Sequence, residues 1–101
     1  MLESTLSKKV NKYLKSLENC WFMKIHGSIF QRAGVPDYIG CYKGIFWGIE
    51  LKVGTNKTSK IQDYMMLLMR SAGGRTIVCY DLIEVKKFMN SLKGESNGYN
   101  V

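Results

Sequence analysis

Residues 34–53 read GVPDYIGCYKGIFWGIELKV and carry the clearest structural signal in the chain. Two runs rich in β-branched and aromatic residues, 37–42 and 45–53, flank the dipeptide Lys43-Gly44. Such runs favour β-strands, and a two-residue connection containing glycine is typical of a tight hairpin turn. The stretch therefore predicts an antiparallel β-hairpin.

The second strand of this hairpin alternates strictly between two faces. Its apolar face comprises Ile45, Trp47, Ile49, Leu51 and Val53. Because residues two apart share a face of a strand, Glu50 and Lys52 project together from the opposite side. Taken alone, such a pair is most often an ordinary charge pair on a solvated face. Its meaning therefore depends on which residues lie beside it.

Asp37 follows Pro36 at the start of the first strand, and a tight hairpin would place it across from Glu50. Carboxylate oxygens suit the hard cations Mg²⁺ and Mn²⁺. Lys52 could then stabilise charge on a phosphate or orient an attacking water. By itself, an aspartate after proline is more typical of a turn or cap. The two carboxylates together indicate a metal site.

The flanking segments alternate between helical and strand periodicity. We expect helices at residues 2–17, 59–72 and 82–92, and further strands at 20–26 and 75–80. The order is then αβββαβα, an α/β fold in which a central mixed sheet is flanked by helices. The β-α-β step through the second helix should be a right-handed crossover with parallel strands.

Each of the first two helices carries an apolar stripe that packing on the sheet would bury. The first stripe comprises Leu6, Val10, Tyr13, Leu14 and Leu17, and the second Ile61, Met65, Leu68 and Ala72. Ser59 with Gln62, and Asp81 with Glu84, match the capping box at a helix start. Gly73 and Gly74 should end the second helix.

Length and composition limit the possibilities. With 101 residues, 46% hydrophobic and 23% charged, the chain can form one domain, expected at 1–92, with a disordered tail at 93–101. No apolar run is long enough to span a membrane, and no secretory signal is visible. The three cysteines are expected to be buried, reduced thiols of a cytoplasmic protein. The net charge of +7 favours a polyanionic partner such as nucleic acid.

Glu3 is a third acid of interest. It lies three residues before Leu6 and seven before Val10, on the apolar stripe of the first helix. Such a carboxylate either interacts with the helix dipole, which is the simpler interpretation, or points into a site.

The combined pattern resembles the virus-type replication-repair (VRR-NUC) branch of the PD-(D/E)xK nucleases. That branch shows an early helical Glu, a G-x-P-D strand start, an E-x-K strand and a Ser-x-x-Gln that opens a helix. The matching residues here are Glu3, Gly34 to Asp37, Glu50 to Lys52 and Ser59 to Gln62. The likeness extends to about Tyr80, and it implies a restriction-endonuclease-like fold. The early Glu is also similar to that of archaeal-type Holliday junction resolvases.

This resemblance implies roles for the matching residues. Asp37 and Glu50 would ligate Mg²⁺ or Mn²⁺ together with the backbone carbonyl of Leu51. Glu3 would bind a second metal or a metal-bound water, and Lys52 would be the catalytic lysine. Gln62 would support the site, although its capping role explains it equally well.

Candidate DNA contacts are less specific. Ser28 and Arg32 precede Asp37 in a loop where resolvase-like enzymes contact the scissile phosphate. Further basic residues that could follow a phosphate backbone are Lys24, Lys43, Lys57 and Lys60. The lone His26 is more typical of a polar strand end than of a catalytic base.

We therefore expect a metal-dependent, structure-selective DNA endonuclease. The resemblance to standalone phage and bacterial members implies a homodimeric four-way (Holliday) junction resolvase of DNA repair, acting in the cytoplasm, which for a phage protein is that of the bacterial host. The six methionines read as core filler or as a subunit interface. Two alternatives remain open: a less selective duplex or flap nuclease, and an inactive nucleic-acid-binding module.

Overall fold

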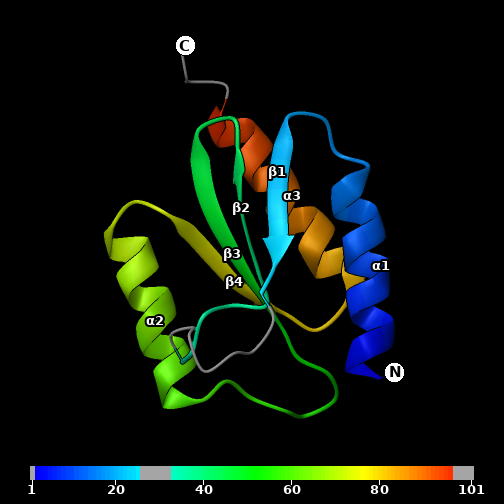
Figure 1. Ribbon diagram of the computed structural model, residues 1–101, viewed down its shortest axis with the longest axis vertical. Coiled ribbons are helices and arrows are strands. Elements are labelled where there is room, and N and C mark those ends of the chain that lie inside the picture. Colours follow the sequence, from blue (N-terminus) through cyan, green and yellow to red (C-terminus); the bar gives the residue numbers. More distant parts are fainter. Residues whose placement is uncertain (1, 26–32, 97–101) are drawn as a thin grey trace.

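The computed structural model describes residues 2–25 and 33–96. Its elements along the chain are α1 (Glu3–Lys15), β1 (Cys20–Lys24), β2 (Tyr38–Tyr42), β3 (Ile45–Leu51), α2 (Lys60–Ser71), β4 (Arg75–Cys79) and α3 (Leu82–Ser96) (Figure 1). The expected order αβββαβα is confirmed. In the two described ranges, no helix has the length and apolarity needed to cross a membrane.

The four strands form one mixed sheet in the order β1-β2-β3-β4. β2 pairs antiparallel with both β1 and β3, and β3 pairs parallel with β4 through α2, as expected. The predicted hairpin turn is present: Lys43 and Gly44 both have positive φ, 48° and 90°. Two consecutive positive values are typical of a type I′ turn, whose twist matches that of the strands.

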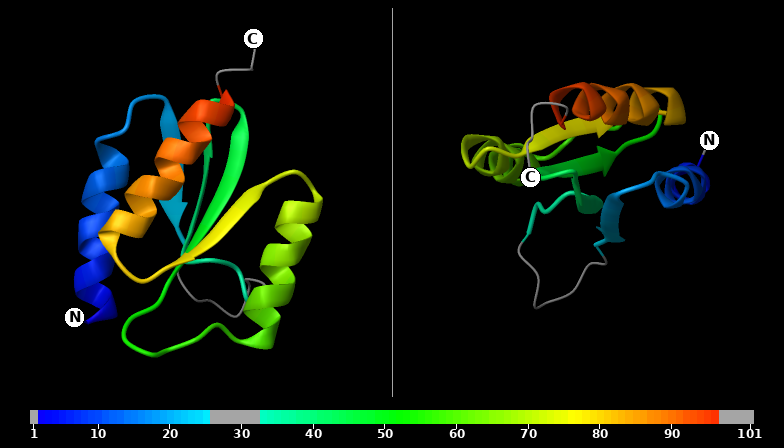
Figure 2. Two further views of the ribbon diagram at one scale, coloured as in Figure 1. Left: turned by 180° about the vertical axis from the view of Figure 1, so that it is seen from behind. Right: turned by 90° about the horizontal axis from the view of Figure 1, so that it is seen from above.

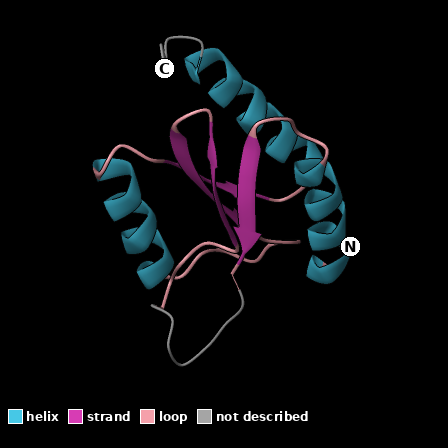
Figure 3. Ribbon diagram, turned by 45° about the horizontal axis from the view of Figure 1, so that its top comes forward, coloured by secondary structure: helices cyan, strands magenta, loops and turns pink. Residues whose placement is uncertain are grey.

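The helices lie on both sides of this sheet. α1 and α3 pack together over one face, where their apolar residues and those of β2 and β3 form the core (Figure 2). Trp47, Tyr38 and Ile49 are fully buried there. α2 lies on the other side, beside β4, so that the strands separate it from α1 and α3 (Figure 3).

The apolar stripe predicted for α2 does not face the sheet, and that prediction is wrong. Ile61 and Leu68 are 46% and 40% exposed, whereas Met66 is the buried residue of this helix. Met69 also faces the sheet, because its Cε lies 2.6 Å from the position that a Cβ on Gly48 would occupy. The helix is therefore rotated from the orientation that its apolar periodicity favours.

The last helix differs from the prediction at both ends. Asp81 Oδ1 accepts a hydrogen bond from Glu84 N, as in a capping box, but the Glu84 carboxylate accepts from Tyr80 N rather than from Asp81 N. The helix also continues past the predicted end at Leu92 to Ser96. Lys93 in its last turn is favourable to the helix dipole. Part of the expected tail is thus helical, and residues 97–101 lie outside the described ranges.

The cysteines are all free, as expected, but they are not all buried. Cys79 is buried and Cys20 partly buried, whereas Cys41 is exposed. Cys41 pairs with Trp21 on β1 and Phe46 on β3, which are also exposed. The expectation of three buried thiols is therefore wrong for Cys41, because it lies on the sheet face opposite α1 and α3.

Candidate active site

The hairpin register brings Asp37 beside Glu50. Tyr38 pairs with Ile49, so the residues next along the two strands, Asp37 and Glu50, continue this alignment. Asp37 Oδ2 accepts a hydrogen bond of 2.8 Å from the backbone N–H of Leu51. This bond fixes the aspartate at the carboxyl end of β3.

Glu50 is buried, with 3% of its surface exposed, rather than lying on a solvated face. Its Oε2 accepts a hydrogen bond from Gln62 Nε2 at 3.1 Å and lies 3.4 Å from the Lys52 ammonium. Lys52, directly after β3, is more accessible, with 18% of its side chain exposed. The E-x-K pair therefore combines a buried acid with a lysine at the surface.

This burial makes negative charge on Glu50 costly. Desolvation by burial and, to a lesser extent, the nearby charge of Asp37 raise the pKa of the Glu50 carboxyl to about 7 against the opposing effect of Lys52. Two adjacent carboxylates with so little cationic compensation favour the binding of an additional positive charge.

Gln62 makes both of the interactions considered for it. With Ser59 it forms a reciprocal capping box at the start of α2, and its amide also reaches Glu50. Gly34 lies close to this first turn of α2. It has φ +84°, and an added Cβ would lie 2.6 Å from the carbonyl oxygen of Ile61. This close approach positions the first turn of α2 next to the loop that carries Asp37.

A cavity of about 250 Å³ adjoins Asp37. The residues that line it are Glu3, Ser4, Ser7, Lys24, Asp37 and Leu51. It lies where the first turn of α1 meets the ends of the strands. Glu3 is thus an exposed residue that lines the same cavity as Asp37.

The donor set fits a hard divalent cation. Within residues 2–25 and 33–96, no three His, Cys, Asp or Glu residues come together closely enough to hold a metal. Glu3 therefore does not form one ligand group with Asp37 and Glu50. Mg²⁺ usually binds through one or two carboxylates and keeps several waters, and Asp37 and Glu50 match this requirement in number and kind.

The basic residues that were predicted to contact DNA lie in different parts of the structure. Lys24 lines the cavity, whereas Lys57 and Lys60 are exposed in the loop before α2 and in its first turn. Lys43 lies in the β2–β3 turn at the opposite end of the sheet, so its expected place at the edge of the site is wrong. The hairpin itself causes this, because its turn and its open end are one strand length apart. Ser28, Arg32 and His26 lie outside the described residues.

Sequence reasoning missed Ser7 and Tyr38. Ser7 is a buried polar residue of α1, and its hydroxyl lies 2.8 Å from that of the buried Tyr38. A signal was present: Ser7 comes four residues after Glu3 and three before Val10 and so interrupts the apolar stripe. A hydroxyl at such a position requires a hydrogen-bonding partner.

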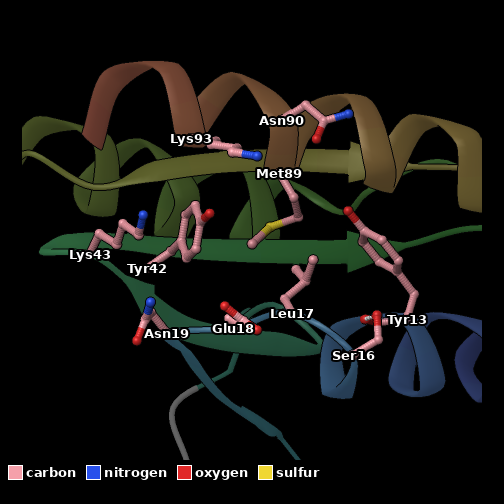
Figure 4. Close-up of a pocket in the computed structure, with 10 residues that line it drawn as sticks. All are labelled: Tyr13, Ser16, Leu17, Glu18, Asn19, Tyr42, Lys43, Met89, Asn90 and Lys93. Carbon is pink, nitrogen blue, oxygen red and sulfur yellow. Dashed lines mark hydrogen bonds between the residues drawn. The ribbon is translucent and has the colours of Figure 1, made fainter. Parts of the chain in front are cut away.

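A second cavity lies at the other end of the molecule, between the end of α1, the β2–β3 turn and α3 (Figure 4). Its volume is about 310 Å³. Glu18 is the carboxylate in its lining, and none of the predicted metal ligands borders it. The figure shows Lys43 and Tyr42 of the hairpin facing Met89 and Lys93 of α3. The acid pair, and not this cavity, is the candidate active site.

Comparisons with known proteins agree with the fold. No family model and no curated protein sequence matches the chain. A solved structure described as "VRR_NUC domain" is similar, with a TM-score of 0.71 and 22% sequence identity. The alignment covers 87% of this chain and 94% of that one. The chain thus has the fold of a VRR_NUC domain over most of its length.

Proposed function

We propose that this protein is a divalent-metal-dependent endonuclease that hydrolyses phosphodiester bonds in DNA. The observation that carries the proposal is the buried Glu50 beside Asp37, with Lys52 3.4 Å from it. Two acids and a lysine at adjoining strand ends form the arrangement that gives PD-(D/E)xK nucleases their name. The shared fold with a VRR_NUC domain structure supports the same conclusion.

Asp37, Glu50 and the backbone carbonyl of Leu51 would hold Mg²⁺ or Mn²⁺. A divalent ion there supplies Lewis-acid activation and neutralises charge on the phosphate. Glu3 lines the same cavity as Asp37, and there it would bind a second ion or a metal-bound water. Gln62 orients the Glu50 carboxylate through Oε2.

Lys52 would provide positive charge to the reacting phosphate. Its ammonium is held close to Glu50 but remains partly exposed, so that it can also contact a substrate oxygen. A cation placed where negative charge develops stabilises the transition state without reorganisation. Buried acids that face a phosphate would weaken simple DNA binding, and for this reason we favour an enzyme over an inactive binding module.

The proposed substrate is branched DNA, in particular a four-way junction cut by a homodimer. A domain of 101 residues has little surface for reading base edges, so recognition of DNA shape and backbone is favoured. A twofold dimer would place two active sites against opposing strands. The proposed setting is DNA repair in the cytoplasm.

The exposed stripe of α2 supports dimerisation. Its members are Ile61, Met65, Leu68 and Ala72, of which Met65 is partly buried, and Tyr64 beside them is also exposed. A hollow of about 630 Å³ lies next to it, lined by Phe46, Met69 and part of the stripe. One surface thus contains both an apolar ridge and an apolar groove. This is what a self-complementary contact between two copies requires.

A charge in this stripe should disrupt the dimer. We expect sedimentation at micromolar concentration to give twice the 11.6 kDa chain mass for the wild type. Leu68→Glu should sediment as a monomer, because two carboxylates would be buried at the interface. Ile83→Glu is the control, since Ile83 is an exposed apolar residue on α3. A monomeric wild type, on and off junction DNA, would refute paired cutting by a dimer.

The function itself is tested by cleavage of end-labelled four-way junction, flap, duplex and single-stranded DNA. With Mg²⁺ or Mn²⁺ we expect symmetric paired cuts in the junction, and no cuts in EDTA. Cleavage of all four substrates alike would support the nuclease activity but exclude selectivity for the junction. Absence of cleavage under every condition, with DNA binding retained, would instead establish a binding module.

A further inference from the structure

The cavity beside Asp37 continues along α1. A neighbouring cavity of about 370 Å³ is lined by Ser4, Ser7, Lys8, Asn11, Lys24 and Tyr38. Ser4, Ser7 and Lys24 line both cavities, so the two adjoin at these residues. Together they form a groove between α1 and β1, here called the α1–β1 groove, which leads from Asp37 towards Asn11.

Lys24 is fixed at the middle of this groove by a closed hydrogen-bond network. Its ammonium donates to Ser7 Oγ at 2.6 Å and lies 5.9 Å from the centre of the Tyr38 ring. The Tyr38 hydroxyl donates to the backbone carbonyl of Ser7 at 3.1 Å. The Ser7 hydroxyl must then donate to the Tyr38 oxygen across their 2.8 Å contact. Both hydroxyl groups in the network therefore have a defined acceptor, and one N–H of Lys24 is directed to Ser7.

This arrangement orders a side chain that is normally mobile. A lysine loses up to about 2 kcal/mol of rotamer entropy when it is fixed, and here that cost is met before any ligand binds. Ser7 and Tyr38 are buried, at 8% and 0% exposure, so they form a rigid support. The lysine itself is exposed to the groove.

The positive charge of Lys24 is available to an anion. Considering residues 2–25 and 33–96, Lys24 forms no ion pair, although Glu3 and Asp37 line the same cavity. An ammonium has three N–H donors, and the bond to Ser7 uses one. Lys8 adds a second cation further along the groove. The groove thus offers two cations, Lys24 and Lys8, and it begins at Asp37 of the proposed active site.

We propose that the α1–β1 groove binds the phosphate backbone of the DNA strand that leaves the active site. Lys24 contacts a phosphate next to the scissile one, and Lys8 contacts one further along. Ser7 and Tyr38 are positioning residues, since they act on DNA through Lys24. This inference rests on the proposed nuclease function, because that function identifies the anion as a polynucleotide.

The test compares Lys24→Ala with Lys9→Ala, whose lysine is exposed on the same helix but lines neither cavity. Binding of junction DNA in EDTA is measured as a function of salt. Losing one phosphate contact should lower the slope of log K against log salt by about 1 for Lys24→Ala alone. Ser7→Ala and Tyr38→Phe should raise KM more than they lower kcat, and Lys24→Arg should restore part of the affinity.

Neutral methylphosphonate substitutions, introduced one at a time at the phosphates around the centre of the junction, provide the specific readout. One position should weaken binding of the wild type and of Lys9→Ala but leave Lys24→Ala unaffected. If no position behaves in this way, the groove does not bind the backbone, whether or not the protein cleaves DNA. If inorganic phosphate binds at Lys24 but no methylphosphonate position behaves in this way, the groove holds an isolated anion and the proposal is also overturned.

The proposed nuclease function can be refuted independently of the groove. It fails if the wild type binds DNA and cuts no substrate with any divalent metal. The methylphosphonate result still decides the groove in that case, because it is measured in EDTA. Thermal melting of each variant verifies that it is folded. Lys24→Ala removes only an exposed side chain and should melt within a few degrees of the wild type.

Discussion

Asp37→Asn should reduce DNA cleavage at least about 1,000-fold while leaving the fold intact. A metal ion at a phosphate contributes several kcal/mol to transition-state stabilisation, and each 1.36 kcal/mol corresponds to a factor of ten in rate. Asparagine is nearly isosteric with aspartate, and its carbonyl oxygen can still accept the hydrogen bond from Leu51 N. The variant thus loses the negative charge but keeps the contact that fixes the strand ends.

The matched control is Glu18→Gln, which changes the net charge by the same amount at an exposed position in the cavity at the other end of the sheet. It should cleave at the rate of the wild type. DNA affinity in EDTA should not fall in Asp37→Asn, because removing an acid from the site reduces repulsion. If folded Asp37→Asn retains activity within tenfold of the wild type, the acid pair is not the metal centre.

The hairpin and its acid pair were predictable because their determinants are local. Period-two alternation determines which face Glu50 and Lys52 share, and the Lys43-Gly44 turn determines the register that puts Asp37 next to Glu50. Neither step needs knowledge of the rest of the chain. The core stripe of α1 was predictable for the same reason, since Leu6, Val10 and Leu14 are all fully buried.

The orientation of α2 was not predictable from its own periodicity. Its apolar stripe would normally face the sheet, but Gln62 must point to Glu50 and Met69 must cover Gly48. These long-range contacts rotate the helix and leave Ile61 and Leu68 exposed. A sequence pattern reports which residues share a helix face, but not whether the sheet or another surface covers that face.

The role of Ser7 escaped prediction for a related reason. Its position in an apolar stripe indicates that it needs a partner, but Tyr38 and Lys24 lie far along the chain on two different strands. For Glu50, the sequence predicted the residues beside it on the strand but did not predict its burial. An E-x-K pair on a strand is solvated unless a helix covers that face, and the coverage by α2 makes this glutamate unusual.

Glu50→Gln should abolish cleavage and, in the absence of metal, stabilise the protein above neutral pH. In the folded state the Glu50 carboxyl stays protonated up to a pH near its pKa of about 7, whereas in the unfolded chain it loses the proton near pH 4.5. Folding therefore binds a proton between these values, and wild-type stability falls as pH rises through this window. A shift of this size corresponds to about 3 kcal/mol, which is an upper bound for the gain in Glu50→Gln.

The difference in unfolding free energy between Glu50→Gln and the wild type should thus be near zero at pH 4.5 and largest at pH 8. Urea denaturation in EDTA at several pH values measures it. Adding Mg²⁺ at pH 8 should stabilise the wild type and not the variant, because a cation binds the ionised carboxylate and favours the folded state. A variant that is less stable than the wild type at pH 8 would mean that Glu50 is satisfied without a metal. The opposite result, a more stable but inactive protein, would identify Glu50 as a residue kept for function at a cost in stability.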